Sequence, residues 1–359
     1  MNAVGFSGSY SPDDVTFLLK PVSLAPTDVA TKERLLQSGA RHYSEMLSAE
    51  HPPDDAYLAL YRSALARNGA RLARDIASVA AALEERSRGR AEIVLASLAR
   101  AGTPIGILLA RALRRMGRSA VHYSISIIRD RGIDRRALDH IAARHAPRDT
   151  VFVDGWTGKG AIAHELRASL LESEFPTVLA VVADPAGVAD IAATGDDYLI
   201  ASGLLNGIVS GLVSRSILTA ELVGPGDFHA CVHYRDLAAH DLSRAFVEHV
   251  DALAARAAPG PIERDAALRA RRAADCAEVV RQLLRITNTG DRNRIKPGIA
   301  EATRALLRRV PDHLFVRDRS DPDVAHLLHL AAAKKLDVRF LSAASRYRAV
   351  AVIKSLGPK

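Results

Sequence analysis

Cysteine is scarce in this chain of 359 residues: Cys231 and Cys276 are the two copies, and they lie far apart. A disulfide-stapled scaffold is therefore excluded. Long apolar runs are also missing, since the weakly polar stretch 199–218 is interrupted by Asn206 and Arg215 and cannot span a bilayer. Residues 1–10 have neither a basic start nor an apolar core, so we expect no cleavable signal. These absences predict a soluble, cytoplasmic protein with no membrane partner.

Hydrophobic residues make up 48% of the chain, which is enough for the buried cores of two or three domains. The formal net charge is +8, and much of the excess is arginine. The guanidinium fork matches phosphate oxygens, so this composition suits the binding of phosphates or nucleic acid. An arginine-rich composition also occurs without any binding site, so it identifies no partner, and the oligomeric state stays unknown.

The apolar pattern predicts an α/β protein. Residues 1–90 form an N-terminal section integral to the first domain, with an extended segment at 15–19 and helices at 31–47 and 56–86. Residues 91–257 form the core, which alternates strands and helices. The expected strands are 92–97, 120–128, 150–153, 177–183 and 228–233. The wholly apolar run 178–182 is typical of a parallel sheet covered by helices on both faces.

The composition changes after the core. Residues 258–290 follow a cluster of proline and glycine and contain an arginine- and alanine-rich helix at 263–286, so we interpret them as a linker. Residues 291–359 form a second, smaller α/β unit. Its expected elements are helices at 296–309 and 322–335 and strands at 314–316, 338–341 and 348–353.

The first domain is organised around residues 151–162. Three apolar residues predict a short buried strand with Asp154 at its carboxyl end, and glycines at 155, 158 and 160 predict a tight turn before a helix. Backbone N–H groups converge in such a turn, so a phosphate would fit there. The spacing matches neither a P-loop nor a dinucleotide fingerprint. An ordinary strand-to-helix turn remains the alternative.

The segment from Asp154 to Gly160 resembles the phosphoribosyl pyrophosphate loop of type I phosphoribosyltransferases, in which an apolar strand leads into an acid, a Thr-Gly pair and a helix. That family grips pyrophosphate with an upstream Arg-x-Gly loop, and Arg100, Ala101 and Gly102 follow the apolar run 93–98. The resemblance implies a type I phosphoribosyltransferase-like parallel sheet flanked by helices. Between the loops, Arg129 and Arg131 are further candidates for pyrophosphate; the alternative is a surface turn with self-paired charges.

The C-terminal unit resembles the Pelota-type RNA-binding domain of the kink-turn-binding superfamily, whose first helix opens with Gly-x-Asn-Glu-x-x-Lys. Gly298, Glu301 and Arg304 occupy three of those places, while Ala300 replaces the asparagine and puts recognition of sheared G·A pairs in doubt. Lys296 and Arg308 complete the candidate RNA contacts. The alternative is a domain kept only for packing.

Both halves together, with the phrases at 17–21, 42–48 and 154–160, resemble the bacterial StiP-type family. In that family a phosphoribosyltransferase-like domain is fused to a Pelota domain, and the genes lie in stress and tellurium-resistance clusters. Names in the family sometimes say cysteine protease.

The resemblance implies a ligand, phosphoribosyl pyrophosphate or a nucleotide, with Mg²⁺ carried mainly by substrate oxygens and water rather than by a protein metal site. Asp154 would accept the ribose hydroxyls and, with Arg100, would be the catalytic residue. The implied substrate-binding residues are Ala101, Gly102, Gly155, Trp156, Thr157, Gly158, Lys159, Gly160, Arg129 and Arg131. The product would be a nucleoside-like metabolite. The family loop usually has two adjacent acids, whereas Gly155 stands at the second place here, so catalysis is altered or absent while binding is retained.

Two other functions stay open, a non-catalytic nucleotide-sensing RNA-binding regulator and a cysteine protease. Cys231 has His229 and His233 on either side, but on a strand each would lie roughly 6.6 Å away along the chain, too far for a hydrogen bond. The two histidines are also too far apart to share zinc. We expect a buried strand cysteine. The acceptor cannot be identified, and residues 199–216, with Asn206 and Arg215, are only a candidate for its side of the site.

Overall fold

The structure is a computed structural model, and it describes residues 5–343 and 345–356. Residues 1–4, at the start of the segment expected to lack a signal, lie outside the described residues. A six-stranded sheet in the order β1-β4-β3-β7-β8-β9 forms the centre of the first domain, and every pairing in it is parallel. Its strands are β1 (Thr16–Leu18), β3 (Ile93–Leu98), β4 (Ala120–Ile125), β7 (Thr150–Trp156), β8 (Leu179–Ala183) and β9 (Ile191–Thr194).

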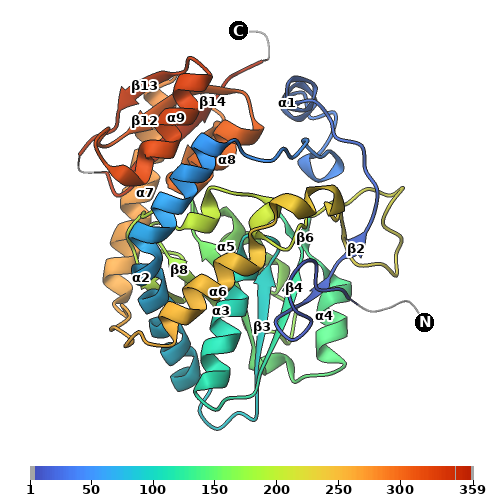
Figure 1. The fold of residues 1–359 in the computed structure, drawn as a ribbon. Coiled ribbons are helices and arrows are strands. Elements are labelled where there is room, and N and C mark those ends of the chain that lie inside the picture. Colours follow the sequence, from blue (N-terminus) through green and yellow to red (C-terminus); the bar gives the residue numbers. More distant parts are fainter. Residues whose placement is uncertain (1–4, 344, 357–359) are drawn as a thin grey trace.

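Helices cover both faces of this sheet (Figure 1). On one face lie α2 (Asp55–Arg86), α3 (Gly102–Arg115) and α6 (Ser243–Ala254); on the other lie α4 (Arg135–Ala142) and α5 (Ala161–Ser169). The side chains of β3 alternate between the two cores, with Ile93 and Leu95 in the first and Val94 and Ala96 in the second. All of them are fully buried, which explains why this strand is apolar at every position except Ser97.

The N-terminal section is less helical than its pattern predicts. The helix expected at 31–47 is α1 (Val29–Gln37), followed by a single 3₁₀ turn at Tyr43–Glu45. Gly39 lies just beyond the helix at a φ of 71°, a left-handed conformation that ends the helix. The second helix is confirmed as α2, whose first turn is capped by the Asp54 carboxylate accepting from the Tyr57 N–H at 2.7 Å.

Two strand predictions in the core were wrong in detail. The expected strand 120–128 is broken into β4 and the two-residue β5 (Ile127–Ile128), which forms a hairpin with β6 (Gly132–Ile133). The expected strand 228–233 is only β10 (Ala230–Cys231), which pairs with β2 (Lys20–Pro21) and is not part of the main sheet. Both are short because their partners β6 and β2 pair with them over two residues each.

The chain then enters α7 (Ala266–Ile286) and a four-stranded sheet in the order β11-β14-β12-β13. Its strands are β11 (Ile295–Pro297), β12 (Pro311–Val316), β13 (Asp337–Phe340) and β14 (Ala349–Ile353), and its helices are α8 (Ile299–Arg308) and α9 (Ala325–Ala333). The helix expected to start at Lys296 begins at Ile299, because Lys296 belongs to β11 and Gly298, at a φ of 89°, turns the chain between them.

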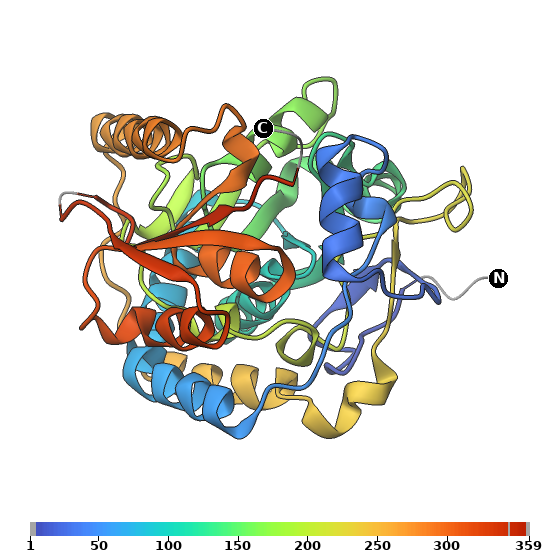
Figure 2. The ribbon, with the colours of Figure 1, turned by 90° about the horizontal axis from the view of Figure 1, so that it is seen from above.

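The predicted fold class is confirmed, since a parallel sheet flanked by helices is joined to a small C-terminal α/β unit. Seen from above, the C-terminal unit lies across one end of the core, with α1 on the opposite side of that end (Figure 2). No helix within 5–343 or 345–356 has the length and apolar character needed to cross a membrane.

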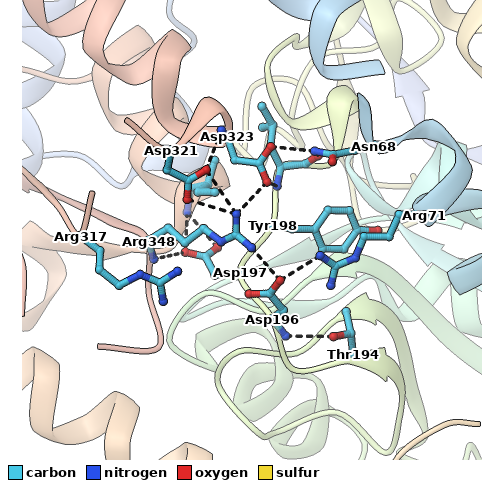
Figure 3. A network of polar contacts seen from close by, with 12 residues as sticks. Asn68, Arg71, Thr194, Asp196, Asp197, Tyr198, Arg317, Asp321, Asp323 and Arg348 are labelled. Carbon is cyan, nitrogen blue, oxygen red and sulfur yellow. Dashed lines mark hydrogen bonds and ion pairs between the residues drawn. The ribbon is translucent and has the colours of Figure 1, made fainter. Parts of the chain in front are cut away.

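A polar network, which we call the junction network, joins the C-terminal unit to the core (Figure 3). The Arg348 guanidinium contacts Asp321 at 3.2 Å and Asp323 at 3.0 Å within its own unit, and Asp196 of the core at 2.8 Å. The buried Asp197 carboxylate accepts from the backbone N–H groups of Ile299 and Arg348, at 3.0 and 2.9 Å. The start of α8 is therefore held directly against the loop that follows β9.

Candidate ligand-binding site

The strand order locates the crevice in which the core can bind a ligand. From β3 the chain proceeds to β4 on one side, and β7, β8 and β9 then build the sheet on the other side. Ligands of open parallel sheets bind where the order reverses, beyond the carboxyl ends of the two central strands. Those strands are β3 and β7, and the residues that follow them are 99–102 and 157–160.

Asp154 lies within β7 and not after its end, because β8 continues to pair with β7 up to Trp156. Its carboxylate accepts the N–H of Gly155 at 2.8 Å and lines two adjoining cavities. Burial raises the pKa of Asp154 to about 6, against the lowering effect of the nearby Arg304 guanidinium and of the Gly155 N–H. The group is thus ionised at neutral pH and can accept hydrogen bonds from a ligand.

The turn after β7 forms the first cavity, the loop cavity, of about 200 Å³. Gly160 has a φ of 83° and leads into α5, whose first turn faces this cavity. Within the described residues, no hydrogen bond engages the backbone N–H groups from Gly158 to Ala163. Thr157 was also expected to bind the substrate, but its hydroxyl donates to Asp184 at 2.6 Å. Free N–H groups at a helix N-terminus favour an anion.

The turn after β3 borders the second cavity, the arginine cavity, of about 190 Å³. Arg100 and Ala101 line it, and the Arg100 guanidinium contacts Glu50 at 3.2 Å and the Val213 carbonyl at 2.7 Å. Gly102 is packed against β7, where a Cβ atom would lie 2.4 Å from the Val153 carbonyl oxygen. The absence of a side chain at Gly102 therefore lets the two central strands bring their turns together.

The C-terminal unit closes both cavities from the opposite side. Arg304 of α8 lines both of them, and its guanidinium lies 5.1 Å from the centre of the Trp156 ring. Arg308 lines the arginine cavity, whereas Lys296 and Glu301 line the loop cavity. The candidate RNA contacts Lys296, Glu301, Arg304 and Arg308 thus face the core, and Gly298 lies at the junction, near Asp197.

Three segments meet at the loop cavity. The Tyr347 hydroxyl donates to the Gly158 carbonyl at 2.7 Å, and the Lys159 ammonium donates to the Arg292 carbonyl at 2.6 Å. Arg129 also lines this cavity, but Arg131 is not among its lining residues and instead pairs with Glu45. The structure therefore brings most of the candidate residues together, whereas Arg131, Gly298, Gly102 and Gly155 do not line either cavity.

Cations far outnumber acids around these cavities and a third one that adjoins them. In the described part of the chain, nine cationic side chains line the three cavities, against the two acids Asp154 and Glu301. The nine are Lys32, Arg100, Arg129, Lys159, Arg215, Lys296, Arg304, Arg308 and Arg309. Burial, reinforced by neighbouring cations, lowers the pKa of Lys159 to about 8 and that of Lys296 to about 7. An anionic ligand would relieve this repulsion.

Sequence reasoning did not select Lys32, Tyr43 or Glu50, which the fold brings to this site. All three lie in the N-terminal section. Lys32 and Glu50 lie outside any motif, and Tyr43 lies in the phrase 42–48, which carries the family resemblance but does not indicate a ligand. Arg215 was only a candidate for the acceptor side.

The two thiols lie elsewhere in the fold. Cys231 is fully buried, and desolvation raises the pKa of its thiol to about 12. The His229 ring is bonded to the Ser126 hydroxyl at 2.8 Å, and Cys276 contacts the Tyr347 hydroxyl. Among the described residues, no hydrogen bond joins either thiol to a histidine. Nor do these residues contain a group of His, Cys, Asp or Glu side chains that could hold a metal ion.

We expect neither thiol to react in the folded protein. With a pKa of about 12, the thiolate of Cys231 is about one part in ten thousand at pH 8. Titration with a chromogenic disulfide reagent should show no fast labelling in native buffer and two reactive thiols in guanidinium chloride. Fast native labelling that disappears in Cys231→Ala would contradict this prediction and favour a nucleophilic role.

Comparison with known proteins agrees with this two-part architecture. Residues 274–355 match the PELOTA RNA binding domain, so the protein is an α/β-sheet protein whose cation-lined crevice is covered by a Pelota-type domain. Residues 8–251 match the family described as "Tellurite-like stress resistance cysteine protease StiP". The chain belongs to the StiP family. The relative named cysteine protease StiP from Acinetobacter baylyi is 43% identical over 98% of this chain and 95% of its own length.

Solved structures with a similar core include two of Trypanosoma cruzi hypoxanthine phosphoribosyltransferase. For one, a point mutant complexed with the product IMP, the identity is 16% and the TM-score 0.28, covering 34% of this chain and 66% of that chain. For the other, the identity is 14% and the TM-score 0.29, covering 36% of this chain and 80% of that chain.

Proposed function

We propose that the protein binds phosphoribosyl pyrophosphate with Mg²⁺ and transfers its phosphoribosyl group to an acceptor, to make or remodel a nucleoside-like metabolite. The observation that carries the proposal is the excess of cations around one ionised carboxylate, Asp154, at the crevice where the strand order reverses. A sugar with a phosphate at one end and a pyrophosphate at the other matches this arrangement, because it presents hydroxyl groups between two anionic groups.

Each part of the donor has a matching group. The free N–H groups from Gly158 to Ala163, with Lys159, suit the 5-phosphate, and Asp154 suits the ribose hydroxyls. Arg100, Arg304 and Arg308 line the arginine cavity, where the pyrophosphate would lie. The two lining acids are too few to hold a metal by themselves. These lining residues suit Mg²⁺ that arrives bound to the phosphate oxygens of the ligand, where the ion would neutralise part of the leaving group's charge.

In the transfer, the bond between the anomeric carbon and pyrophosphate breaks, and pyrophosphate leaves with the electron pair. The acceptor forms the new bond to that carbon and releases its proton to solvent. Positive charge develops on the sugar near the Asp154 carboxylate, while negative charge grows on the leaving group near Arg304 and Arg308. The fixed charges of the cavities stabilise both changes, so no protein nucleophile is required.

A second candidate is a non-catalytic regulator that senses a nucleotide and binds RNA, and the Pelota match favours it. In the closed arrangement the cations of α8 face the core, so RNA would reach them only after the two units separate. The regulator predicts binding of the donor without release of pyrophosphate, whereas the enzyme predicts release that depends on acceptor and Mg²⁺. For the protease suggested by the relative's name, the buried thiols offer no support.

Calorimetric titration with phosphoribosyl pyrophosphate and Mg²⁺ tests the proposal. We expect binding by the unmodified protein and by Cys231→Ala, and binding weakened about tenfold to a hundredfold in Arg304→Met, since a hydrogen bond to a charged group contributes about 1.5–3 kcal/mol. Arg135→Met removes an exposed cation of α4 and should bind as the unmodified protein does. If the unmodified protein shows no heat of binding, the transferase and the donor-sensing regulator are both wrong.

A further inference from the structure

A third cavity, of about 140 Å³, adjoins the two donor cavities on the side of the N-terminal section. We call it the lysine cavity. It shares Arg304 with both donor cavities, Arg308 and Arg215 with the arginine cavity, and Lys296 with the loop cavity. Lys32 of α1 and Arg309 line the lysine cavity alone among the three. Leu36, Ala305 and the Tyr43 ring add an apolar part to its wall.

The partners of these cations leave the lysine cavity with unbalanced positive charge. The Lys32 side chain is 4% exposed, and its ammonium donates to two neutral groups, the Ser48 hydroxyl and, at 3.2 Å, the Arg308 carbonyl. Arg309 is paired with the fully buried Glu33 at 2.8 Å. Within the described residues Glu301 is the one acid on the wall, and it is bonded to Arg304 at 2.8 Å.

Arg215 provides a second, independent sign of a missing ligand. One terminal nitrogen, Nη2, donates to the carbonyls of Tyr43 and Met46. The other, Nη1, is buried and has no hydrogen-bond partner among the described residues. A buried charged donor without a partner costs free energy, and the two cavities that Arg215 lines offer space for an acceptor oxygen.

Electrostatics point the same way. Burial, together with Arg215, Arg309 and Arg308, lowers the pKa of Lys32 to about 7. Burial, with nearby Arg100, lowers the pKa of Arg308 to about 9. Among the described residues the acids nearby are Glu33, Glu50 and Glu301, and each of them already contacts an arginine. A bound anion would offset the repulsion among these cations and favour their charged forms.

We propose that the lysine cavity binds an anionic group of the acceptor, a carboxylate or a phosphate, through Lys32 and Arg215. This inference rests on the proposed function only where it identifies the ligand as the acceptor. The anion site itself is inferred from the lining of the cavity. The donor is an unsuitable occupant, because neither Asp154 nor either loop lines the lysine cavity. At about 140 Å³ the lysine cavity is smaller than either donor cavity, and the shared Arg304 and Arg308 keep it next to the leaving group.

The test uses the full chain saturated with phosphoribosyl pyrophosphate and Mg²⁺, so that the donor cavities are filled. Three probes are titrated by calorimetry: inorganic phosphate, nicotinate, and its neutral isostere nicotinamide. We expect at least one of the two anions to bind and nicotinamide not to bind. Which anion binds more tightly distinguishes a phosphate from a carboxylate group.

Lys32→Met should weaken that anion binding at least tenfold and leave donor binding within about twofold, whereas Lys334→Met, an exposed loss of the same charge, should change neither. Because the ammonium of Lys32 is buried, its removal should preserve or raise the melting temperature, which separates a lost contact from misfolding. A paired Glu33→Gln, Arg309→Gln variant removes both charges together and gives a second test.

The result that overturns the proposal is binding of nicotinamide as tight as that of the better-bound anion, no binding of either anion, or an unchanged affinity for that anion in Lys32→Met. Loss of donor binding in Lys32→Met would also overturn it, because the cavity would then belong to the donor. If the donor itself does not bind, the titrations are repeated without it. Anion binding that needs Lys32 but not Asp154 would then retain the anion site and reject only the transferase.

Discussion

Replacing Asp154 by asparagine is expected to weaken the binding of phosphoribosyl pyrophosphate by about a hundredfold while making the protein more stable at pH 8. Among the residues that the structure describes, this carboxylate is the one acid that lines both donor cavities. Each hydrogen bond from a ribose hydroxyl to a charged oxygen contributes about 1.5–3 kcal/mol, and an amide is a weaker acceptor. The same loss of negative charge removes the stabilisation of a cationic sugar, so turnover should fall further than binding.

The stability change follows from the sign of the pKa shift. The pKa of Asp154 is raised from 3.8 to about 6 by burial, so this residue contributes stability that is complete below pH 3.8 and is lost as the pH rises through about 6. Asparagine cannot ionise and keeps that contribution at pH 8. We expect a gain of about 1–2 kcal/mol, less than the full shift implies because the carboxylate faces a cavity.

Thermal unfolding between pH 4 and pH 8 measures this effect. The melting temperature of Asp154→Asn should exceed that of the unmodified protein at pH 8, and the two should converge near pH 4. Asp13→Asn, which changes an exposed carboxylate, should show no such difference. In the unmodified protein, donor affinity should fall as the pH drops through about 6. Undiminished donor binding by Asp154→Asn would remove this residue from the site.

Replacing Arg348 by methionine is expected to lower the free energy of unfolding by about 2–4 kcal/mol, the largest stability loss that we predict for a side chain outside the cavities. Three carboxylates, Asp196, Asp321 and Asp323, would lose the guanidinium that they share (Figure 3). The loss is below the full cost of a broken buried pair, because Arg71 still contacts Asp196 at 2.9 Å and Asn68 still donates to Asp323 at 2.8 Å.

Function should weaken together with this network. Arg348 is in contact with the loop that also holds the first N–H group of α8, so its removal frees the helix that carries Arg304 and Arg308. We expect weaker donor binding and faster proteolysis between the two units in Arg348→Met. Arg317→Met is the matched control, since Arg317 lies beside the network and its guanidinium donates to the Ser345 carbonyl at 3.1 Å and to no carboxylate among the described residues. Urea unfolding that is equal for both variants would contradict this account of the junction.

Much of the core can be predicted from the sequence because its signals are local. Local structure is indicated within a few residues by the apolar run of β3, by the glycines at 102 and 160, and by the acid at 154. The length of β7 could not be predicted in this way. Asp154 and Trp156 belong to the strand only because β8 extends far enough to pair with them.

The composition of the site could not be predicted locally, because its residues come from segments far apart in the chain. Lys32 and Arg308 are 276 positions apart, yet the Lys32 ammonium donates to the Arg308 carbonyl. Likewise, the sequence of the C-terminal unit alone indicates that its cations contact RNA, because nothing in the sequence of α8 indicates which neighbour its basic face contacts.

By itself the sequence determined the order of strands and helices, the two turns after β3 and β7, and the two families that the segments resemble. These depend on apolar periodicity, glycine placement and motif spacing, all of which act over short distances. Only the tertiary structure decided that the basic face of the Pelota-type domain closes over the core. Asp197 and Arg348 orient α8 through contacts between units, and the direction of a helix face is set by such long-range packing.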